Sequence, residues 1–463
     1  MSSGRGNGRG RPRRKDRVDP ARRIAFEVLD AVDQEDAYSN LRLAQALREH
    51  DLNDRDAALA TELTFGTLRL RGRYDAVISA CVNRDLDSLD PPVLTVLRLG
   101  SHQLLSMRIP DYAAVGSSVA LVKEIVGHRV GGFVNAVLRK VAVRDWPQWQ
   151  DELVSHAEPL LRRLSITQSH PEWIIEALSR ALSACDRQDE LEALLGVNNT
   201  APPVTLVARP GRITQQQLLE QSGGEPGRWS PWAVRLAGDP GRVAAVRSGA
   251  AGVQDEGSQV VVQGAWQAGV AEERQWLDLC AGPGGKAALL AGLAEPVGAH
   301  LTAVELHRHR LELVARSLPE PQRVTLVQGD ATQLRLPAAD RVLLDTPCLG
   351  LGVLRRRPEL RWRRSPGQLQ DLQGMQRRLL STALEHLRPG GLVAYVTCSP
   401  HLGETDEIVD HALARHADIR LEPVRDPVPG LGAATARGTL RLWPHIHDTD
   451  GMYLALLRRR ATP

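Results

Sequence analysis

The sequence predicts a multidomain protein with an all-helical bundle, a small α+β domain and a C-terminal α/β domain built on a doubly wound, mainly parallel sheet. Three observations lead to this prediction. Hydrophobic residues recur at helical spacing through the first third of the chain, and Pro and Gly residues interrupt the middle. In the last part, short hydrophobic runs alternate with helical patterns. The 463 residues suffice for several domains, each with its own core.

The N-terminal part combines a basic tail with a helical region. Residues 1–18 are rich in Gly and Arg and show no hydrophobic periodicity, so we expect an unstructured tail whose charge suits a polyanion. Asp19 and Pro20 are typical of an N-cap and first helical position. Helical spacing continues from there, and we assign residues 19–145 to an all-helical bundle.

The remaining chain divides into two further predicted domains. Residues 146–252 contain a helical piece and one clear strand, Val204 to Ala208, and we expect a small α+β domain there. Residues 253–463 repeat the order strand, turn, helix, which is typical of a doubly wound sheet. The strands expected in this last domain are Trp276–Cys280, Leu301–Glu305, Val324–Gln328, Arg341–Asp345, Leu392–Thr397 and Met452–Leu457.

Composition narrows the class of protein. The chain has no continuous apolar run of about 18 residues and no apolar signal core, so we expect a soluble protein without a membrane segment. Its five cysteines form no CxxC pair, which favours reduced thiols in the cytoplasm and argues against a zinc site or any other metal.

A glycine-rich turn follows the first strand of the α/β domain, in the segment LDLCAGPGGKAALLAGL. Glycines allow close backbone approach to a ligand, and the next helix offers free N–H groups. A phosphate-binding P-loop is excluded because Ala287 follows Lys286 and Cys280 stands where an earlier Gly is needed. The dinucleotide fingerprint GxGxxG is incomplete. A turn that holds an adenosyl ligand without a pyrophosphate remains.

Acidic residues end the next two strands. Glu305 is placed to accept hydrogen bonds from two ribose hydroxyls, as an acid about 20 residues beyond such a turn does. Asp330 could accept from an adenine amino group. The alternative is that each acid caps the following helix, but their succession behind the glycine turn favours a ligand role.

Two cysteines follow strands directly, Cys348 in DTPC and Cys398 in TCS, and Asp345 stands three residues before the first. A thiolate is well suited to add to C6 of a cytosine and leave again, which makes C5 nucleophilic towards a methyl sulfonium. A carboxylate near N3 can support the adduct, and a base must remove the C5 proton. Cys398, Asp345 and Cys348 supply this minimum set. The plainer alternative is two buried structural thiols.

At these residues the chain resembles the bacterial 16S rRNA cytosine-C5 methyltransferases of the Sun/Fmu (RsmB-like) family. The motifs DTPCLGLGVLRRRPELRWRRS and TCSPHLGET carry the resemblance, and FGTLRLRGRYD and FVNAVLRKV are similar to its NusB-like RNA-binding domain. The resemblance implies a NusB-like bundle, a middle domain and a Rossmann-like methyltransferase fold that binds S-adenosyl-L-methionine. It implies Cys398 as nucleophile and Cys348 in product release. The implied cofactor contacts are Cys280, Ala281, Gly282, Pro283, Gly284, Gly285, Lys286, Glu305, Asp330 and Asp345.

We therefore expect methyl transfer from S-adenosyl-L-methionine to C5 of a cytosine in 16S rRNA, or in a small-subunit assembly intermediate, by a monomer. The basic run Arg355 to Arg364 is expected beside the active site, in contact with phosphates, with Trp362 stacking on RNA or packing. Two alternatives stay open: a tRNA cytosine-C5 methyltransferase, and a non-catalytic RNA-binding or ribosome-assembly factor.

Overall fold

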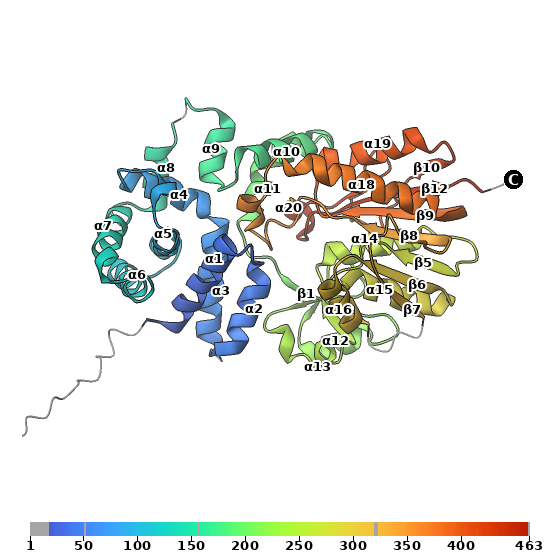
Figure 1. Cartoon of the computed structure of the whole chain (residues 1–463), viewed down its shortest axis with the longest axis horizontal. Coiled ribbons are helices and arrows are strands. Elements are labelled where there is room, and N and C mark those ends of the chain that lie inside the picture. The colour runs from blue at the N-terminus through green and yellow to red at the C-terminus, as the bar shows by residue number, and fades with distance from the viewer. Residues whose placement is uncertain (1–17, 51, 156, 319–322, 462–463) are drawn as a thin grey trace, which may run out of the picture. The chain divides into compact units, whose positions relative to one another are not determined.

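The structure is a computed structural model that describes residues 18–50, 52–155, 157–318 and 323–461 (Figure 1). The predicted basic tail, apart from Val18, lies outside the described residues. The chain divides into two compact units. The first contains the described residues up to Glu172 together with Arg357–Glu359, and the second contains the rest.

The first unit is helical, as predicted. Its first helix begins as expected: the Asp19 carboxylate accepts a hydrogen bond from the Arg22 N–H at 3.1 Å, and Pro20 occupies the first turn. Apolar residues at helical spacing, such as Ile24 and Val28, enter one core shared with the following helices. The helices are α1 (Pro20–Gln34), α2 (Ser39–His50), α3 (Asp54–Arg69), α4 (Arg71–Cys81), α5 (Pro91–Leu105), α6 (Asp111–Ile125), α7 (Gly131–Val141), α8 (Trp146–Leu153) and α9 (Leu160–Thr167).

In the second unit, two helices are followed by a small antiparallel sheet of order β2-β3-β1-β4. Strand β1 has the predicted bounds, Val204–Ala208, and β4 ends at Val253. Leu206, Leu218 and Val234 contribute to a small separate core beneath this sheet. The elements of this part are α10 (Glu172–Ser183), α11 (Leu191–Asn198), β1, α12 (Gln215–Ser222), β2 (Glu225–Pro226), β3 (Ala233–Leu236), α13 (Ala244–Arg247) and β4 (Ala251–Val253).

A larger sheet of order β10-β12-β9-β8-β5-β6-β7 forms the rest of the second unit, with β11 paired to β12. The strands from β9 to β7 run parallel, whereas β12, β10 and β11 add antiparallel pairs at one edge. The sequence did not predict β10 and β11, and β9 begins five residues before the predicted Leu392. The strands are β5 (Gln275–Asp278), β6 (His300–Glu305), β7 (Val324–Gln328), β8 (Ala339–Asp345), β9 (Leu387–Thr397), β10 (Ile419–Glu422), β11 (Leu440–Arg441) and β12 (Tyr453–Arg459).

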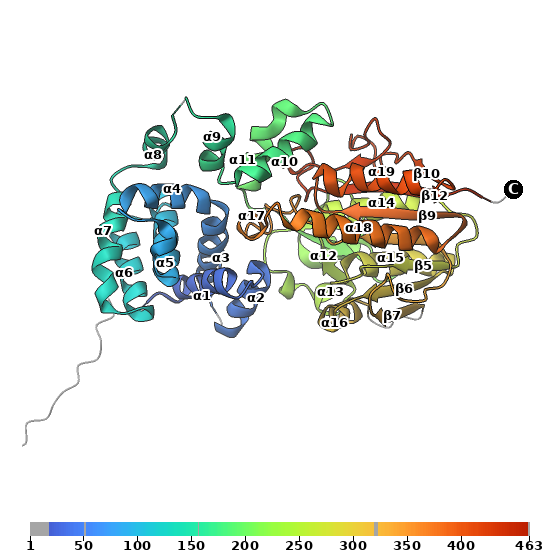
Figure 2. The same cartoon turned by 45° about the horizontal axis from the view of Figure 1, so that its top comes forward.

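Helices cover both faces of this sheet, as the doubly wound prediction requires. Alternating strand side chains enter two cores: Leu343 packs on the α14 and α15 side, and its neighbours Val342 and Leu344 pack on the α18 and α19 side. Figure 2 shows α18 and α19 running alongside the sheet. The helices are α14 (Glu256–Gln267), α15 (Gly285–Val297), α16 (Arg308–Ser317), α17 (Leu360–Arg363), α18 (Gln368–Glu385), α19 (Asp406–Arg415) and α20 (Pro444–His447).

The strand order reverses at β5, which lies between β6 and β8. In sheets of this kind the crevice outside the carboxyl ends of the strands at such a reversal is the usual ligand site. The glycine-rich turn follows β5, Asp345 ends β8 and Cys398 follows β9. Within the described residues, no helix is both long and apolar enough to span a bilayer.

Candidate functional site

Two thiols meet at the carboxyl ends of β8 and β9. These strands pair in parallel with Asp345 opposite Val396, and the Thr346 N–H continues the pairing with a hydrogen bond of 3.0 Å to the Val396 carbonyl. The Sγ atoms of Cys348 and Cys398 lie 3.4 Å apart, and both thiols are free. Cys348 is buried, with 9% of its surface exposed, and Cys398 is a partly exposed residue at the margin of a hydrophobic core.

A close backbone approach holds the Cys398 turn. The Gly352 N–H donates a hydrogen bond of 2.8 Å to the Cys398 carbonyl. A Cβ atom at position 352 would lie 2.1 Å from the Gly451 carbonyl oxygen and 2.8 Å from that of Cys398. Both contacts are with backbone, so residue 352 must be glycine for these segments to pack.

Lys286 joins the glycine-rich turn to the sulfur site. Its Nζ lies 2.9 Å from Oδ2 of Asp345. Burial by itself would lower the pKa of Lys286, but the charge and hydrogen bond of Asp345 outweigh it and the pKa is raised. The charge of Cys398 raises the pKa of Lys286 further. The ammonium group therefore stays charged beside both Asp345 and Cys398.

Cys348 has a different electrostatic environment. Its pKa is raised well above the ordinary value, first by the hydrogen bond with Cys398 and then by burial. The charges of Cys398, Glu404 and Asp345 raise it further. Negative charge is thus disfavoured on the Cys348 sulfur in the resting protein.

The glycine-rich turn has the geometry of a ligand cradle. Gly284 has φ 113°, and a Cβ there would lie 2.1 Å from Oγ of Ser317 and 2.9 Å from Cα of Val314. The free N–H groups of α15 begin at the next residue. Glu305, 3% exposed, faces this turn and accepts from the Gly282 N–H at 3.0 Å. The structure thus brings Glu305 against the predicted glycine-rich turn.

Asp330 lies next to this cradle, but its carboxylate is used locally. The adjacent Gly329 N–H donates to the Glu305 carbonyl at 3.1 Å. The Asp330 carboxylate accepts from the N–H and hydroxyl of Thr332, at 2.9 and 2.7 Å, and from Gln333 at 3.1 Å. The hydroxyl bond of Thr332 is the main cause of its lowered pKa. The Asp330 carboxylate therefore caps the turn that follows it, which was the alternative to a ligand role in the sequence analysis.

The sequence interpretation missed two polar residues at the turn. Asp278 ends β5 and is 1% exposed, and its Oδ2 has no hydrogen-bond partner among the described residues. Burial, with the nearby charge of Asp345, raises its pKa to about 7. Gln254, just after β4, is buried with neither side-chain polar atom bonded within the described chain. Its side chain would lie 3.6 Å from a Cβ at Gly285.

Such orphaned polar atoms are costly when nothing pairs with them, so they indicate a site for a polar ligand. Asp278 could have been found from the sequence, because it ends a strand as Glu305 and Asp345 do. The sequence around Gln254 contains no strand-end acid or other motif that would have indicated a role at this turn. It reaches the turn only because β4 of the small sheet leads into α14, with the Gln254 N–H bonded to the Thr205 carbonyl at 3.0 Å.

The expectation that the run Arg355 to Arg364 contacts phosphates is wrong for three of its arginines, which are tied to the protein. Arg355 and Arg356 form ion pairs with Asp448 and with Asp255 and Asp450. Arg361 is 0% exposed and donates to the carbonyl of Asn198 and to Oδ1 of Asn199. These three arginines therefore bind carboxylate, amide and carbonyl oxygens that lie far away in the sequence.

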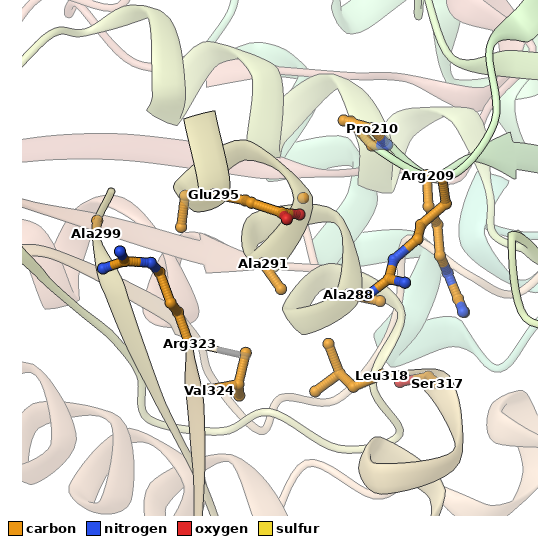
Figure 3. A pocket seen from close by; sticks show the side chains of 13 residues that line it. Arg209, Pro210, Ala288, Ala291, Glu295, Ala299, Ser317, Leu318, Arg323 and Val324 are labelled. Atoms are coloured by element: carbon orange, nitrogen blue, oxygen red, sulfur yellow. The ribbon is translucent and has the colours of Figure 1, made fainter. Parts of the chain in front are cut away.

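A separate cavity of about 120 Å³ lies between the small sheet and α15. Figure 3 shows Arg209 and Arg323 on its two sides, with Glu295 between them. Of the described residues that line it, none is a predicted site residue. Its volume is below the roughly 300–1,000 Å³ of sites for drug-sized ligands. Elsewhere, the described residues contain no group of three or more His, Cys, Asp or Glu arranged to hold a metal.

Comparisons with known proteins agree with this architecture. Residues 268–458 match a family model described as 16S rRNA methyltransferase RsmB/F, and residues 19–143 match the NusB family model. Over 96% of this chain and 99% of the other, the fold is similar to the solved structure of PH0851, with a TM-score of 0.79 at 24% identity.

The curated relatives cover nearly the whole chain. A Mycobacterium tuberculosis protein named "Putative methyltransferase Rv1407" is 48% identical over 97% of this chain and 98% of its own. A Synechocystis protein named "Probable ribosomal RNA small subunit methyltransferase B" is 30% identical over 95% of this chain and 99% of its own. A Bacillus subtilis protein of the same name is 29% identical over 95% and 98%.

Replacing Asp278 by Asn should change the pH dependence of stability. The folded-state pKa of about 7 exceeds the ordinary 3.8, so this carboxyl stabilises the fold below about pH 4, and the contribution is lost as the pH rises through 7. The loss is on the order of 4 kcal/mol for one fully buried group. Urea unfolding of ligand-free protein between about pH 4.5 and 8 should show a flatter curve for Asp278→Asn than for wild type. Exposed Asp371→Asn is the control, and parallel curves for Asp278→Asn and wild type would contradict the assignment.

Arg361→Ala should destabilise the second unit rather than act only on RNA affinity. It removes two charge-assisted hydrogen bonds from a site with 0% exposure, at a cost of about 3 kcal/mol in the free energy of unfolding. Exposed Arg377→Ala on α18 should stay within about 0.5 kcal/mol of wild type in the same urea titration. Equal stability of the two variants would show that Arg361 is not a structural residue.

Proposed function

This chain belongs to the RsmB/F family of S-adenosyl-L-methionine-dependent RNA cytosine-C5 methyltransferases, and we propose that its substrate is a cytosine of 16S rRNA. The observation that carries the proposal is the pair of thiols 3.4 Å apart at the ends of β8 and β9, beside a cofactor-type glycine turn. The family description and the names of the relatives at about 30% identity support ribosomal RNA as the substrate. The NusB match in the helical region supports RNA binding.

The residues at the turn fit the cofactor. The unpaired atoms of Asp278 and Gln254 beside the glycine cradle offer a polar ligand both acceptors and a donor. We propose that the predicted turn, Cys280 to Lys286, holds it together with Glu305 and Asp345. Asp330 remains a candidate for the adenine amino group, since a carboxylate oxygen can accept a second hydrogen bond. When bound, S-adenosyl-L-methionine supplies an electrophilic methyl group.

The two thiols would have different roles because their surroundings differ. The hydrogen bond with Cys398, burial and nearby carboxylates disfavour the thiolate of Cys348, whereas the Lys286 ammonium interacts with Cys398. Cys398 is also a partly exposed residue, as a group that must reach a substrate ring should be. We therefore assign the nucleophile to Cys398, in agreement with the sequence interpretation.

In the proposed reaction, the Cys398 thiolate forms a bond to C6 of the cytosine. The electron pair displaced from the C5–C6 double bond makes C5 nucleophilic. The proton that the Cys398 thiol gives up passes through the Asp345 carboxylate to N3, where it stabilises the adduct, and it returns when the adduct breaks. Lys286, 2.9 Å from Asp345, keeps that carboxylate oriented. After C5 has been methylated, the C5 proton must be removed so that the Cys398–C6 bond can break and return its electron pair to sulfur.

Cys348 is suited to remove that proton at this late stage. In the resting protein the hydrogen bond with Cys398 is the largest cause of its raised pKa, and the charge of Cys398 is another. Once Cys398 is bonded to carbon, it carries no charge and no longer shares a proton with Cys348. Both contributions then disappear, which lowers the pKa of Cys348 and lets its thiol proton pass to water. The resulting thiolate takes up the C5 proton.

The RNA must present its base outside a helix, because the sulfur attacks the face of the ring. We propose that residues 19–145 bind the RNA, either free 16S rRNA or a small-subunit assembly intermediate, and that the protein acts as a monomer. A ribosomal RNA substrate would require the protein in the cytoplasm.

The assignment of the cysteines can be tested by substitution. Cys398→Ala should lower methyl transfer to RNA at least about 10⁴-fold while cofactor binding by calorimetry stays unchanged, because only the covalent step is lost. Cys348→Ala should form the adduct and fail to release it, giving a covalent RNA–protein band on a denaturing gel. Cys185→Ala, half-buried and outside the site, is the matched control. Normal turnover by Cys398→Ala, or the absence of a trapped band with Cys348→Ala, would contradict the respective role.

The substrate can be identified by bisulfite sequencing of total RNA from a strain that lacks this gene. We expect the loss of one or more 5-methylcytosines in 16S rRNA and their return when the wild-type gene, but not Cys398→Ala, is supplied. Loss in tRNA alone would move the proposal to a tRNA substrate. If the deletion strain keeps all its 5-methylcytosines and the purified protein does not bind S-adenosyl-L-methionine, the protein has a non-catalytic role in RNA binding.

A further inference from the structure

A buried carboxylate lies behind the two thiols. Glu404 ends a single 3-10 turn, Leu402–Glu404, six residues after Cys398, and it is 0% exposed. Burial raises its pKa, and this effect is opposed by hydrogen bonds from the Leu349 N–H and Gln376. An ionisable group buried in this way is costly unless its hydrogen bonds compensate, so its partners show what it holds.

On one side Glu404 holds the turn that carries Cys348. Its Oε1 accepts from the Leu349 N–H at 2.8 Å and from Nε2 of Gln376 at 3.1 Å. The same Gln376 Nε2 donates to the Pro347 carbonyl at 2.9 Å. Pro347 and Leu349 flank Cys348 in the chain, so both of its neighbours are linked to this carboxylate.

On the other side the main chain of Glu404 is tied to the strand that leads to Cys398. The Tyr395 hydroxyl, on β9, donates to the backbone carbonyl of Glu404 at 2.8 Å. Ser399, which follows Cys398, is fully buried. The backbone of Ser399 is in turn held by the Thr397 hydroxyl, at 2.9 and 3.0 Å.

Glu404 therefore joins the turn that carries Cys348, through its carboxylate, to the strand that leads to Cys398, through its backbone carbonyl. We propose that Glu404 is a positioning residue that holds the Cys348 turn in register with the end of β9, so that the two sulfurs face each other across one substrate ring. Its carboxylate acts through Leu349 and Gln376. The inference rests on the proposed function, in which these sulfurs carry out addition and elimination.

Sequence alone does not distinguish this role from that of an ordinary surface acid. Glu407, three residues later in the same segment, is exposed, whereas Glu404 is enclosed by α18, β9 and the turn after β8. The pair provides a matched comparison within one segment of the chain. Only the tertiary structure shows which of the two carboxylates contacts the sulfur site.

The test measures the geometry of the thiols separately from methyl transfer. In full-length protein without RNA or cofactor, diamide takes up two hydrogen atoms from two thiols and leaves a disulfide, at a rate that depends on how the sulfurs face each other. Mass spectrometry of the Cys348–Cys398 crosslink gives this rate. Single-turnover methyl transfer and cofactor affinity are measured on the same preparations.

Glu404→Ala should slow both crosslinking and methyl transfer on the order of 10- to 100-fold, because small displacements of reacting groups have effects of this size. Cofactor affinity should stay within about 3-fold, since Glu404 makes no contact with the glycine turn. Glu404→Gln should restore the crosslinking rate, because its amide oxygen can accept the same two hydrogen bonds. Glu407→Ala should match wild type in every measurement.

Wild-type crosslinking by folded Glu404→Ala, or equal defects in the Ala and Gln variants, would overturn the proposal. If Glu404→Ala does not fold, Gln376→Ala replaces it, because that change cuts the link to Pro347 and leaves the carboxylate in place. An unchanged crosslinking rate in Gln376→Ala would then overturn it. Failure of the wild-type protein to methylate any RNA would count against the proposed function alone, since crosslinking requires neither RNA nor cofactor.

Discussion

The parallel pairing of β8 and β9 is the constraint on which the site depends. Because the strands run in the same direction, both end at the same edge of the sheet, and the register places Asp345 opposite Val396. The residues that follow, Cys348 and Cys398, are thereby brought to 3.4 Å although 50 residues separate them in the chain. An antiparallel pair with the same sequences would put the two turns at opposite ends of the sheet.

The two sulfurs lie in different electrostatic environments. Lys286 belongs to the glycine-rich turn after β5, and its ion pair with Asp345 connects the cofactor side of the crevice to the end of β8. Cys348, by contrast, is surrounded by influences that raise its pKa, of which the hydrogen bond with Cys398 is the strongest. Negative charge is therefore disfavoured on the Cys348 sulfur. This difference depends on burial and on neighbours from several strands, not on the residue type.

Burial also explains why charge alone is a poor guide to the RNA contacts of this protein. Arg355, Arg356 and Arg361 follow the turn of Cys348 in the sequence, yet they are paired with Asp448, Asp450, Asn199 and other acceptors within the second unit. Their guanidinium groups bind distant parts of the second unit to the loop after Cys348. Arginine suits this use because its planar fork can satisfy several acceptors at once.

The sequence by itself determined the fold class, because helical and strand periodicity, the glycine-rich turn and the strand-end motifs are all local signals. Strand Val204–Ala208, the cap at Asp19 and the family were predicted from such signals. The tertiary structure alone decided which polar side chains meet. Gln254 reaches the turn from the small sheet, the Glu404 carboxylate contacts the turn that carries Cys348, and Arg361 is bonded inside the protein. These outcomes depend on partners far apart in the chain and on desolvation, and neither is encoded in a local pattern.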